Sequence, residues 1–142
     1  MADNIATWRR EGVHPVHAIL LASTIPLFLG ALLADWGYST SYQIQWTNFA
    51  SWLIAGGLVF AGLALAWAII DSLRADRRRQ RAWLYPALIL ATFVVGFFNA
   101  LVHAKDGWAS MPAGFILSAT VLVLAIAANW AAHSQAGTGD RR

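Results

Sequence analysis

Residues 83–105 read WLYPALILATFVVGFFNALVHAK, a stretch long and apolar enough to cross a bilayer as one helix. Along it and just beyond, polar or small residues recur at helical spacing: Thr92, Gly96, Asn99, His103 and Asp106. Unpaired polar groups in hydrocarbon cost free energy, so this face is expected to point toward other helices or a water-filled recess. The stretch therefore predicts a membrane helix that belongs to a bundle.

The composition of the whole chain supports a membrane location. Of its 142 residues, 58% are hydrophobic and only 12% are charged, against roughly 25% charged residues in soluble domains. The chain contains no cysteine, which excludes disulfides, thiolate zinc sites, iron–sulfur clusters and haem attached through a Cys-x-x-Cys-His motif. Basic residues cluster in short segments beside apolar spans, so no nucleic-acid partner is expected.

Four apolar segments are long enough to cross a hydrocarbon core of about 30 Å as helices. The expected spans cover about residues 17–36, 48–71, 83–104 and 111–132. Residues 1–142 would form a single four-span domain, with residues 133–142 as a flexible tail. The predicted fold class is therefore all-α, an integral membrane four-helix bundle with short connections.

The distribution of positive charge predicts the orientation of this bundle. The segment 74–81, RADRRRQR, carries five arginines between the second and third spans. With four spans, this loop and both termini share one side, which holds nine of the ten basic residues, and only Lys105 lies opposite. Because short cytoplasmic loops are rich in lysine and arginine, both termini are expected to be cytoplasmic.

Small residues form a second periodic pattern, on one face of the second span. They fall at i, i+4, i+7 and i+11: Gly57, Ala61, Ala64 and Ala68. Such a face allows two membrane helices to approach closely, so we expect a helix-packing surface, with a substrate groove as the alternative. Asn99 lies deep enough in the third span to need a partner on another helix.

Polar residues gather at both ends of the predicted bundle. The cytoplasmic set comprises His14, His17, Asp71, Asn129 and His133. The outer set comprises Asp35, Trp36, Asn48, Asn99, His103 and Asp106. Ionisable residues inside membrane spans are functional candidates by default, whereas those near span ends often contact water or headgroups.

Haem b is one cofactor that histidines of the cytoplasmic set could hold. Two axial histidines must lie at the same depth on facing helices. His17 with His133, or His14 with His133, meets this condition, whereas His17 and His103 lie at opposite surfaces, about 30 Å apart. The alternative for His14, His17 and His133 is an interfacial role in contact with water or headgroups.

A metal ion is the corresponding candidate ligand for the outer set. His103, Asp35 and Asp106 combine imidazole and carboxylate groups, which suit zinc, iron or manganese. The alternative for His103 and Asp35 is a buried hydrogen bond that fixes the helix register. The chain has no G-x-S-x-G, H-E-x-x-H or phosphate-loop motif, so no hydrolytic activity of its own is predicted.

Several short motifs, taken in order, resemble a known family. They are H-P-x-H at His14–His17, Asp35 at the end of the first span, NFASWLIAGGLVFAG at 48–62, FNALVHAKDGW at 98–108 and PAGFILSA at 112–119. Together they are similar to the bacterial predicted membrane proteins grouped as domain of unknown function 2231, over about residues 14–130. The resemblance implies a multi-pass protein of the bacterial inner membrane.

The chain also departs from the pattern of this family. The family often has a proline after the second histidine, where this chain has Ala18, and its mid-span proline lies two positions before Pro26. Any role of the helix kink at the family's mid-span proline is therefore not assigned to this chain. The family carries no activity to transfer, but similar domains are sometimes joined to Rieske-type or other electron-transfer modules, and this association implies a redox setting.

Three functions are consistent with these patterns. The first is a non-catalytic anchor or accessory subunit of a redox or respiratory membrane assembly, docked to other membrane subunits. The second is a haem b-binding protein that transfers electrons between quinol and a partner. The third is a proton- or ion-conducting homo-oligomer that uses Asp35, Asn99 and His103.

Overall fold

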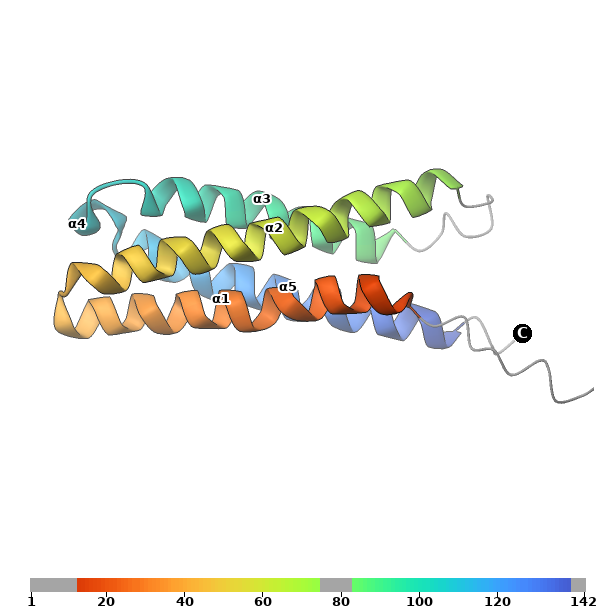
Figure 1. The fold of residues 1–142 in the computed structure, drawn as a ribbon, viewed down its shortest axis with the longest axis horizontal. Coiled ribbons are helices and arrows are strands. Elements are labelled where there is room, and N and C mark those ends of the chain that lie inside the picture. Colours follow the sequence, from red (N-terminus) through yellow and green to blue (C-terminus); the bar gives the residue numbers. More distant parts are fainter. Residues whose placement is uncertain (1–12, 75–82, 139–142) are drawn as a thin grey trace, which may run out of the picture.

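Helices make up the described part of the chain, which in this computed structural model comprises residues 13–74 and 83–138. In order they are α1 (Pro15–Ser41), α2 (Ile44–Arg74), α3 (Leu84–His103), α4 (Gly107–Ser110) and α5 (Ala113–Thr138). The four long helices run side by side, and the short α4 lies at one end of the bundle (Figure 1). Within the described residues, these four are long and apolar enough to cross a membrane. The predicted all-α membrane bundle is thus confirmed.

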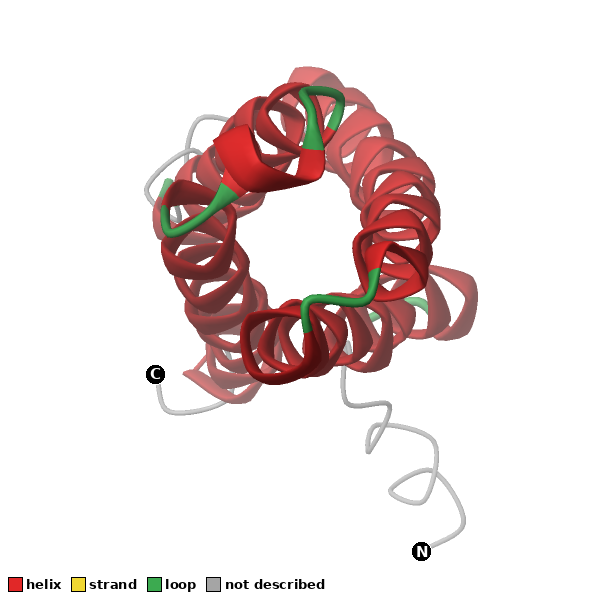
Figure 2. Ribbon diagram, turned by 90° about the vertical axis from the view of Figure 1, so that its left-hand side faces the viewer, coloured by secondary structure: helices red, strands yellow, loops and turns green. Residues whose placement is uncertain are grey.

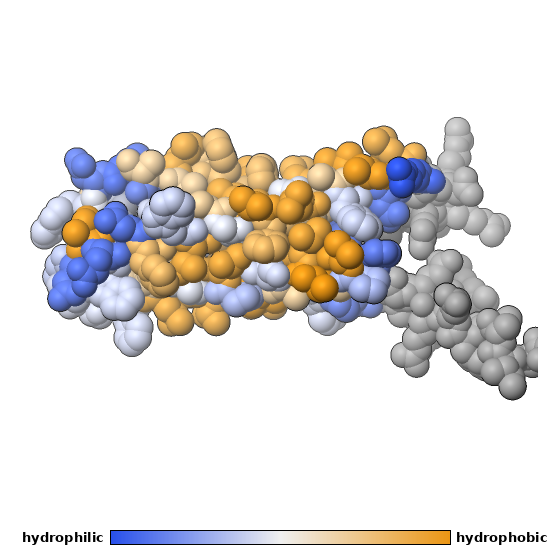
Figure 3. Space-filling view, in the orientation of Figure 1, coloured by the Kyte–Doolittle hydropathy of each residue, from blue (hydrophilic) through white to orange (hydrophobic). Residues whose placement is uncertain are grey.

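The four long helices form a ring when viewed along the bundle (Figure 2). Helix α1 packs against α2 and α5, and α3 packs against the same two neighbours. Consequently α1 and α3 are diagonal partners, and side chains that join them must cross the centre of the bundle. On the face drawn in Figure 3, hydrophobic residues cover the middle and hydrophilic residues gather toward the ends. This distribution suits a multi-pass protein in contact with a lipid bilayer.

Helices α1 and α2 extend well beyond the predicted spans 17–36 and 48–71. The polar, uncharged segment 37–48 is almost wholly helical, and only Tyr42 and Gln43 separate the two helices. Hydroxyl groups near the end of α1 bond to carbonyls of their own helix: Ser39 to Trp36, Thr40 to Trp36 and Gly37, and Ser41 to Gly37. These bonds satisfy the hydroxyls without a loop, so a polar sequence here does not end the helix.

The other connections also differ in detail from the prediction. The link after the third span contains the helical turn α4. Helix α5 continues to Thr138, into the segment 133–142 that was expected to be a flexible tail. Most of the predicted arginine-rich loop, residues 75–82, lies outside the described residues, as do residues 1–12 and 139–142.

The middle of the bundle is packed around the ring of Phe28, which is fully buried. A Cβ atom added at Gly57 would lie 2.6 Å from Phe28 Cε1, and one added at Gly96 would lie 3.6 Å from Phe28 Cζ and 3.4 Å from Val121 Cγ2. Glycine at position 57 of α2 therefore makes room for the aromatic ring of α1, whereas a Cβ at Gly96 would come closest to Leu58 Cδ2, at 3.0 Å. Val121 and Ala125 of α5 complete this apolar level.

A second contact ties α1 to α5 beside the proline inside α1. Asn129 Nδ2 donates to the carbonyl oxygen of Leu21 at 2.9 Å, and also to Ala125 of its own helix at 3.1 Å. The Leu21 carbonyl accepts a further bond from Thr24 Oγ1 at 2.6 Å. Proline at position 26 removes a backbone donor from this turn, and side chains of α1 and α5 supply donors to the carbonyls nearby.

Candidate functional site

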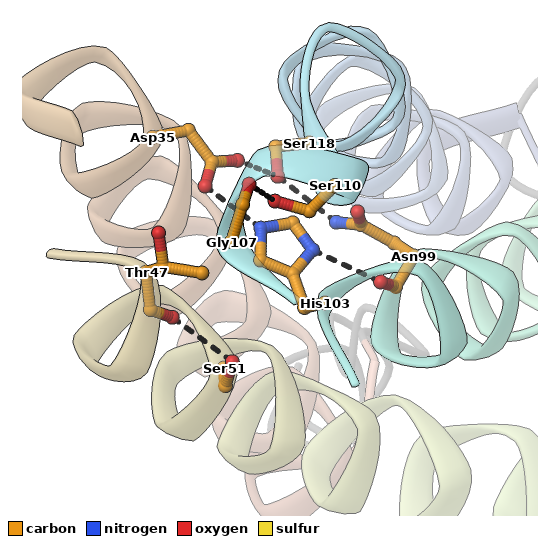
Figure 4. A network of polar contacts seen from close by, with 8 residues as sticks. All are labelled: Asp35, Thr47, Ser51, Asn99, His103, Gly107, Ser110 and Ser118. Carbon is orange, nitrogen blue, oxygen red and sulfur yellow. Dashed lines mark hydrogen bonds and ion pairs between the residues drawn. The ribbon is translucent and has the colours of Figure 1, made fainter. Parts of the chain in front are cut away.

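Buried polar side chains from three long helices meet inside the bundle, toward the end that carries α4 (Figure 4). Asp35 comes from α1, Asn99 and His103 come from α3, and Ser118 comes from α5. Asp35, Asn99 and Ser118 have no exposed surface, and His103 is 5% exposed. We call these four residues the α4-end network. Such complete burial of an ionisable pair in an apolar bundle requires close hydrogen-bond partners.

Both oxygens of the Asp35 carboxyl group are engaged in this network. His103 Nε2 lies 2.7 Å from Asp35 Oδ1. Ser118 Oγ donates to Asp35 Oδ2 at 2.5 Å and accepts a bond from Asn99 Nδ2 at 2.9 Å. The carboxyl group of α1 is thereby joined to the diagonal helix α3 directly, and again through α5.

The second ring nitrogen of His103 holds the imidazole in position along its own helix. His103 Nδ1 lies 3.0 Å from the carbonyl oxygen of Asn99, one turn earlier on α3. A carbonyl oxygen can only accept, so Nδ1 carries a hydrogen and donates it. The ring packs against Gly114 of α5, where an added Cβ would lie 2.8 Å from His103 Cε1. Both the ring orientation and its tautomer follow from these contacts.

Every helix contributes a buried polar residue to this end of the bundle. Thr47 of α2 and Ser110 of α4 lie beside the network (Figure 4), and they are 3% and 0% exposed. Ser110 Oγ donates to the carbonyl of Gly107 at 2.7 Å, within α4. Within the described residues, Thr47 Oγ1 and Asn99 Oδ1 are buried without a hydrogen-bond partner.

The structure brings together two of the three residues predicted to bind a metal. Asp35 and His103 are in contact, whereas Asp106 is exposed and precedes α4 as its N-terminal cap position. Helix α3 ends at His103, so Asp106 leaves the face on which its spacing had placed it. Across residues 13–74 and 83–138, no three His, Cys, Asp or Glu residues are grouped as a metal site requires. The geometry is that of a hydrogen-bonded pair.

A second polar contact crosses the bundle at the opposite end, between His17 of α1 and Tyr85 of α3. The Tyr85 hydroxyl lies 2.7 Å from His17 Nε2, and the two rings meet edge to face. Trp67 of α2 packs against His17 and His14, with ring centroids 5.7 and 5.0 Å apart. His17 is 6% exposed, and its Nδ1 has no partner among the described residues.

Of the histidines predicted as haem ligands, His14 and His17 share contacts with Trp67, whereas His133 bonds within its own helix. His133 is exposed, and its Nδ1 lies 2.7 Å from the carbonyl of Asn129 in its own helix. His14 is exposed, and its Nδ1 accepts a bond from the backbone N–H of Val16 at 3.3 Å. Within the described residues, no hydrogen bond or ring contact joins His133 to His14 or His17. Since Tyr85 occupies Nε2 of His17, Nδ1 is the ring nitrogen of His17 that is left without a partner among the described residues.

The residues predicted to pack helices all lie inside the bundle. Gly57, Ala61 and Ala64 are fully buried or nearly so, Ala68 is 4% exposed, and Asn99 bonds to Ser118 of α5. Ala61, Ala64 and Ala68 belong to one apolar cluster with Leu21 and Ile89, from α1 and α3. This cluster and the level of Phe28 separate the two polar ends. Between the α4-end network and His17, the described core contains these apolar clusters and the buried hydroxyls of Thr24 and Thr92, each bonded to a carbonyl of its own helix.

Two residues of these contacts, Ser118 and Tyr85, were not predicted from the sequence. Ser118 lies four residues after Gly114 on the buried face of α5, within the PAGFILSA motif. Tyr85 is separated from His17 by 68 residues, and His103 is separated from Asp35 by the same number. On two parallel helices, side chains at the same level have the same sequence separation at both ends. This equality could have paired His17 with Tyr85 and Asp35 with His103.

Comparison with known proteins places the whole bundle in one family. The model of a predicted membrane protein family, DUF2231, matches residues 13–136, which include α1 to α4 and nearly all of α5. No curated protein and no solved structure matches the chain. The chain thus belongs to the predicted membrane protein family DUF2231.

Proposed function

We propose that this protein is a non-catalytic membrane anchor or accessory subunit of a larger membrane assembly. The observation that carries the proposal is that both oxygens of the Asp35 carboxyl group and both ring nitrogens of His103 have hydrogen-bond partners in the α4-end network. Asp35 and His103, which are both buried in the bundle, bond to each other and to Ser118 and Asn99. Side chains engaged in this way support the fold rather than a reaction.

The outer surface of the bundle supplies the contacts that an anchor needs. Large apolar side chains on every long helix point outward, among them Leu33, Trp52, Phe98 and Trp130. The two-residue connection between α1 and α2 and the short α4 leave little loop at the α4 end for an independent active site. The partners would be other membrane subunits, with a second copy of the chain as the alternative.

The nature of the assembly is the further part of this proposal. The association of similar domains with electron-transfer modules supports a redox or respiratory assembly in the bacterial inner membrane, with both termini cytoplasmic. The haem b alternative has less support, because Tyr85 lies at Nε2 of His17 and His133 bonds to its own helix. The conducting alternative has less support, because apolar clusters lie between the two polar ends.

The test is respiration in membranes from cells that lack the protein. We expect the quinol oxidation rate to fall, and to recover with the wild-type chain but not with Gly57→Leu, which disrupts packing against Phe28. On native gels in mild detergent, the wild-type chain should migrate with an assembly much larger than itself. Unchanged quinol oxidation together with migration as a single chain would contradict the proposal.

Topology is tested separately by cysteine labelling, since the natural chain has no cysteine. A single cysteine at Gln80, in the arginine-rich segment, should react with a membrane-impermeant reagent only after the cytoplasmic side is opened. A cysteine at Asp106 should react in intact cells. The reverse pattern would overturn the orientation.

A further inference from the structure

The hydrogens of the α4-end network can be counted from its geometry. Asn99 Nδ2 donates to Ser118 Oγ, so the Ser118 hydroxyl hydrogen is directed to Asp35 Oδ2. His103 Nδ1 donates to the Asn99 carbonyl. These bonds place the hydroxyl hydrogen of Ser118, one amide hydrogen of Asn99 and the Nδ1 hydrogen of His103. The contact that remains is the 2.7 Å approach of His103 Nε2 to Asp35 Oδ1.

This last contact accommodates a single hydrogen. With none, a lone pair on Nε2 faces a carboxylate oxygen. With two, an N–H faces an O–H at hydrogen-bond distance. With one, the contact is a hydrogen bond whichever atom carries it, and the Asp35–His103 pair has no net charge. A buried site strongly favours this state, because either alternative leaves a net charge without a partner.

From this geometry we propose that Asp35 and His103 form one proton-binding site, whose single proton holds the diagonal helices α1 and α3 together at the α4 end. Gain or loss of the proton breaks the direct bond between α1 and α3. Acidity would then act on the packing of this end of the bundle, independently of any partner that the protein anchors.

The surroundings contain few other charges that could act on the pair. On α1, Tyr38 lies one turn from Asp35, with its hydroxyl against Gly107 of α4. In the link between α3 and α4, Lys105 and Asp106 are exposed. The neighbouring side chains from α2, α4 and α5 are the uncharged Thr47, Ser110 and Ser118. Among the described residues at this end, Asp35 and His103 are therefore the buried acid and base, whereas Lys105 and Asp106 are exposed.

The substitution Asp35→Asn separates proton binding from hydrogen bonding. The amide introduced at this position can donate to Nε2 of a neutral His103 ring and accept from Ser118, so the variant needs no shared proton. Protonation of its His103 ring would create a buried cation without a carboxylate partner. The melting temperature of the wild type minus that of the variant should therefore fall as pH rises, by about 4 °C or more between pH 5 and 9.

Asp106→Asn provides the matched control, because it makes the same chemical change at an exposed position of the same end. Its difference from the wild type should vary much less with pH. If the wild type and Asp35→Asn differ by the same amount at every pH, the proton-binding site is refuted. Loss of the anchoring function would leave this result unaffected, since melting is measured on the isolated protein.

A spectroscopic measurement on the wild type keeps the proposal testable should Asp35→Asn fail to fold. The protein is labelled with ¹⁵N-histidine and ¹³C-aspartate in detergent, and His103 is assigned by elimination with His14→Ala, His17→Ala and His133→Ala. We expect Nδ1 of His103 to remain protonated while Nε2 and one aspartate carboxyl signal shift in a common pH step. Separate steps, or no shift in either signal, would refute the shared site.

Discussion

The diagonal helices α1 and α3 meet through side chains at both ends of the bundle, and the two contacts are built differently. At the α4 end, Asp35 and His103 are buried and bonded further to Ser118 and Asn99, so three helices share the network. At the opposite end, His17 and Tyr85 make one hydrogen bond, and His17 Nδ1 has no partner among the described residues. The first contact is a network across three helices, in which Asn99 Oδ1 has no partner among the described residues, and the second is a single bond.

The spacing of these contacts explains how they act together. In both, the partners are 68 residues apart, so α1 and α3 run parallel and in register over about five turns, or about 27 Å. Between them, the Phe28 ring fills the level of Gly57 and Gly96. In such a bundle, the stability of the apolar centre depends on side-chain volume, whereas the stability of the polar ends depends on which donor and acceptor atoms are present.

The largest effect is expected from a change at the level between the two contacts. Gly57→Leu places a side chain where even a Cβ would approach the Phe28 ring to 2.6 Å, which moves α1 away from α2 and disturbs both ends. We predict a loss of at least about 3 kcal/mol in the free energy of unfolding. The measurement is unfolding in mixed detergent micelles.

The adjacent glycine supplies the control for this prediction. A Cβ at Gly56 would lie 3.6 Å from Leu27, an ordinary contact, so Gly56→Ala should leave the protein as stable or up to about 1 kcal/mol more stable. Phe28→Ala should restore part of the stability of Gly57→Leu. Equal stability of Gly57→Leu and the wild type would show that Phe28 does not fix this level.

The next largest effect is expected at the α4-end network. Asp35→Ala leaves His103 Nε2 and the hydroxyl hydrogen of Ser118 buried without partners, and each lost bond adds a desolvation cost. We predict a loss of about 2–3 kcal/mol. Helices α1 and α3 should separate first at the α4 end, so amide hydrogen exchange should rise there more than around His17. An even rise along both helices would contradict a local role for Asp35.

The smallest effect is expected at the single bond. Tyr85→Phe removes the hydroxyl from His17 Nε2 but keeps the ring that packs edge to face against it. Hydrogen bonds between membrane helices contribute on average about 0.6 kcal/mol, and we predict a loss of about that size. A loss as large as that of Asp35→Ala would mean that the contacts at the two ends contribute equally to the free energy of unfolding.

Sequence patterns predicted the helices better than the contacts between them. Hydropathy and length predicted the four long helices, and the spacing of Thr92, Gly96, Asn99 and His103 selected the face of α3 that is buried. The same spacing placed Asp106 on this face, but α3 ends at His103 and the chain turns away. Periodicity describes a helix only as far as it continues, and its end depends on local contacts.

The polar partners were harder to predict because a hydroxyl in a membrane helix can donate either to a carbonyl of its own helix or to a side chain of another helix. Ser23 and Thr92 bond to carbonyls of their own helices, whereas Ser118 bonds to Asp35 across the bundle. The local sequence of these residues does not separate the two cases. Hydrogen bonding of His103 with Asp35 was one of two alternatives, and only the relative placement of α1 and α3 shows which atoms lie in reach.

A double-mutant cycle at Asp35 and His103 tests most directly the claim that these residues serve each other inside the bundle. The free energy of unfolding is measured for the wild type, Asp35→Ala, His103→Ala and the double variant, because the cycle isolates the interaction between the two side chains. We predict that the double variant is at least as stable as the less stable of the two single variants. This result corresponds to a coupling energy above about 1 kcal/mol between the two side chains. Additive losses, with no coupling energy, would contradict the account and assign each side chain a partner outside the pair.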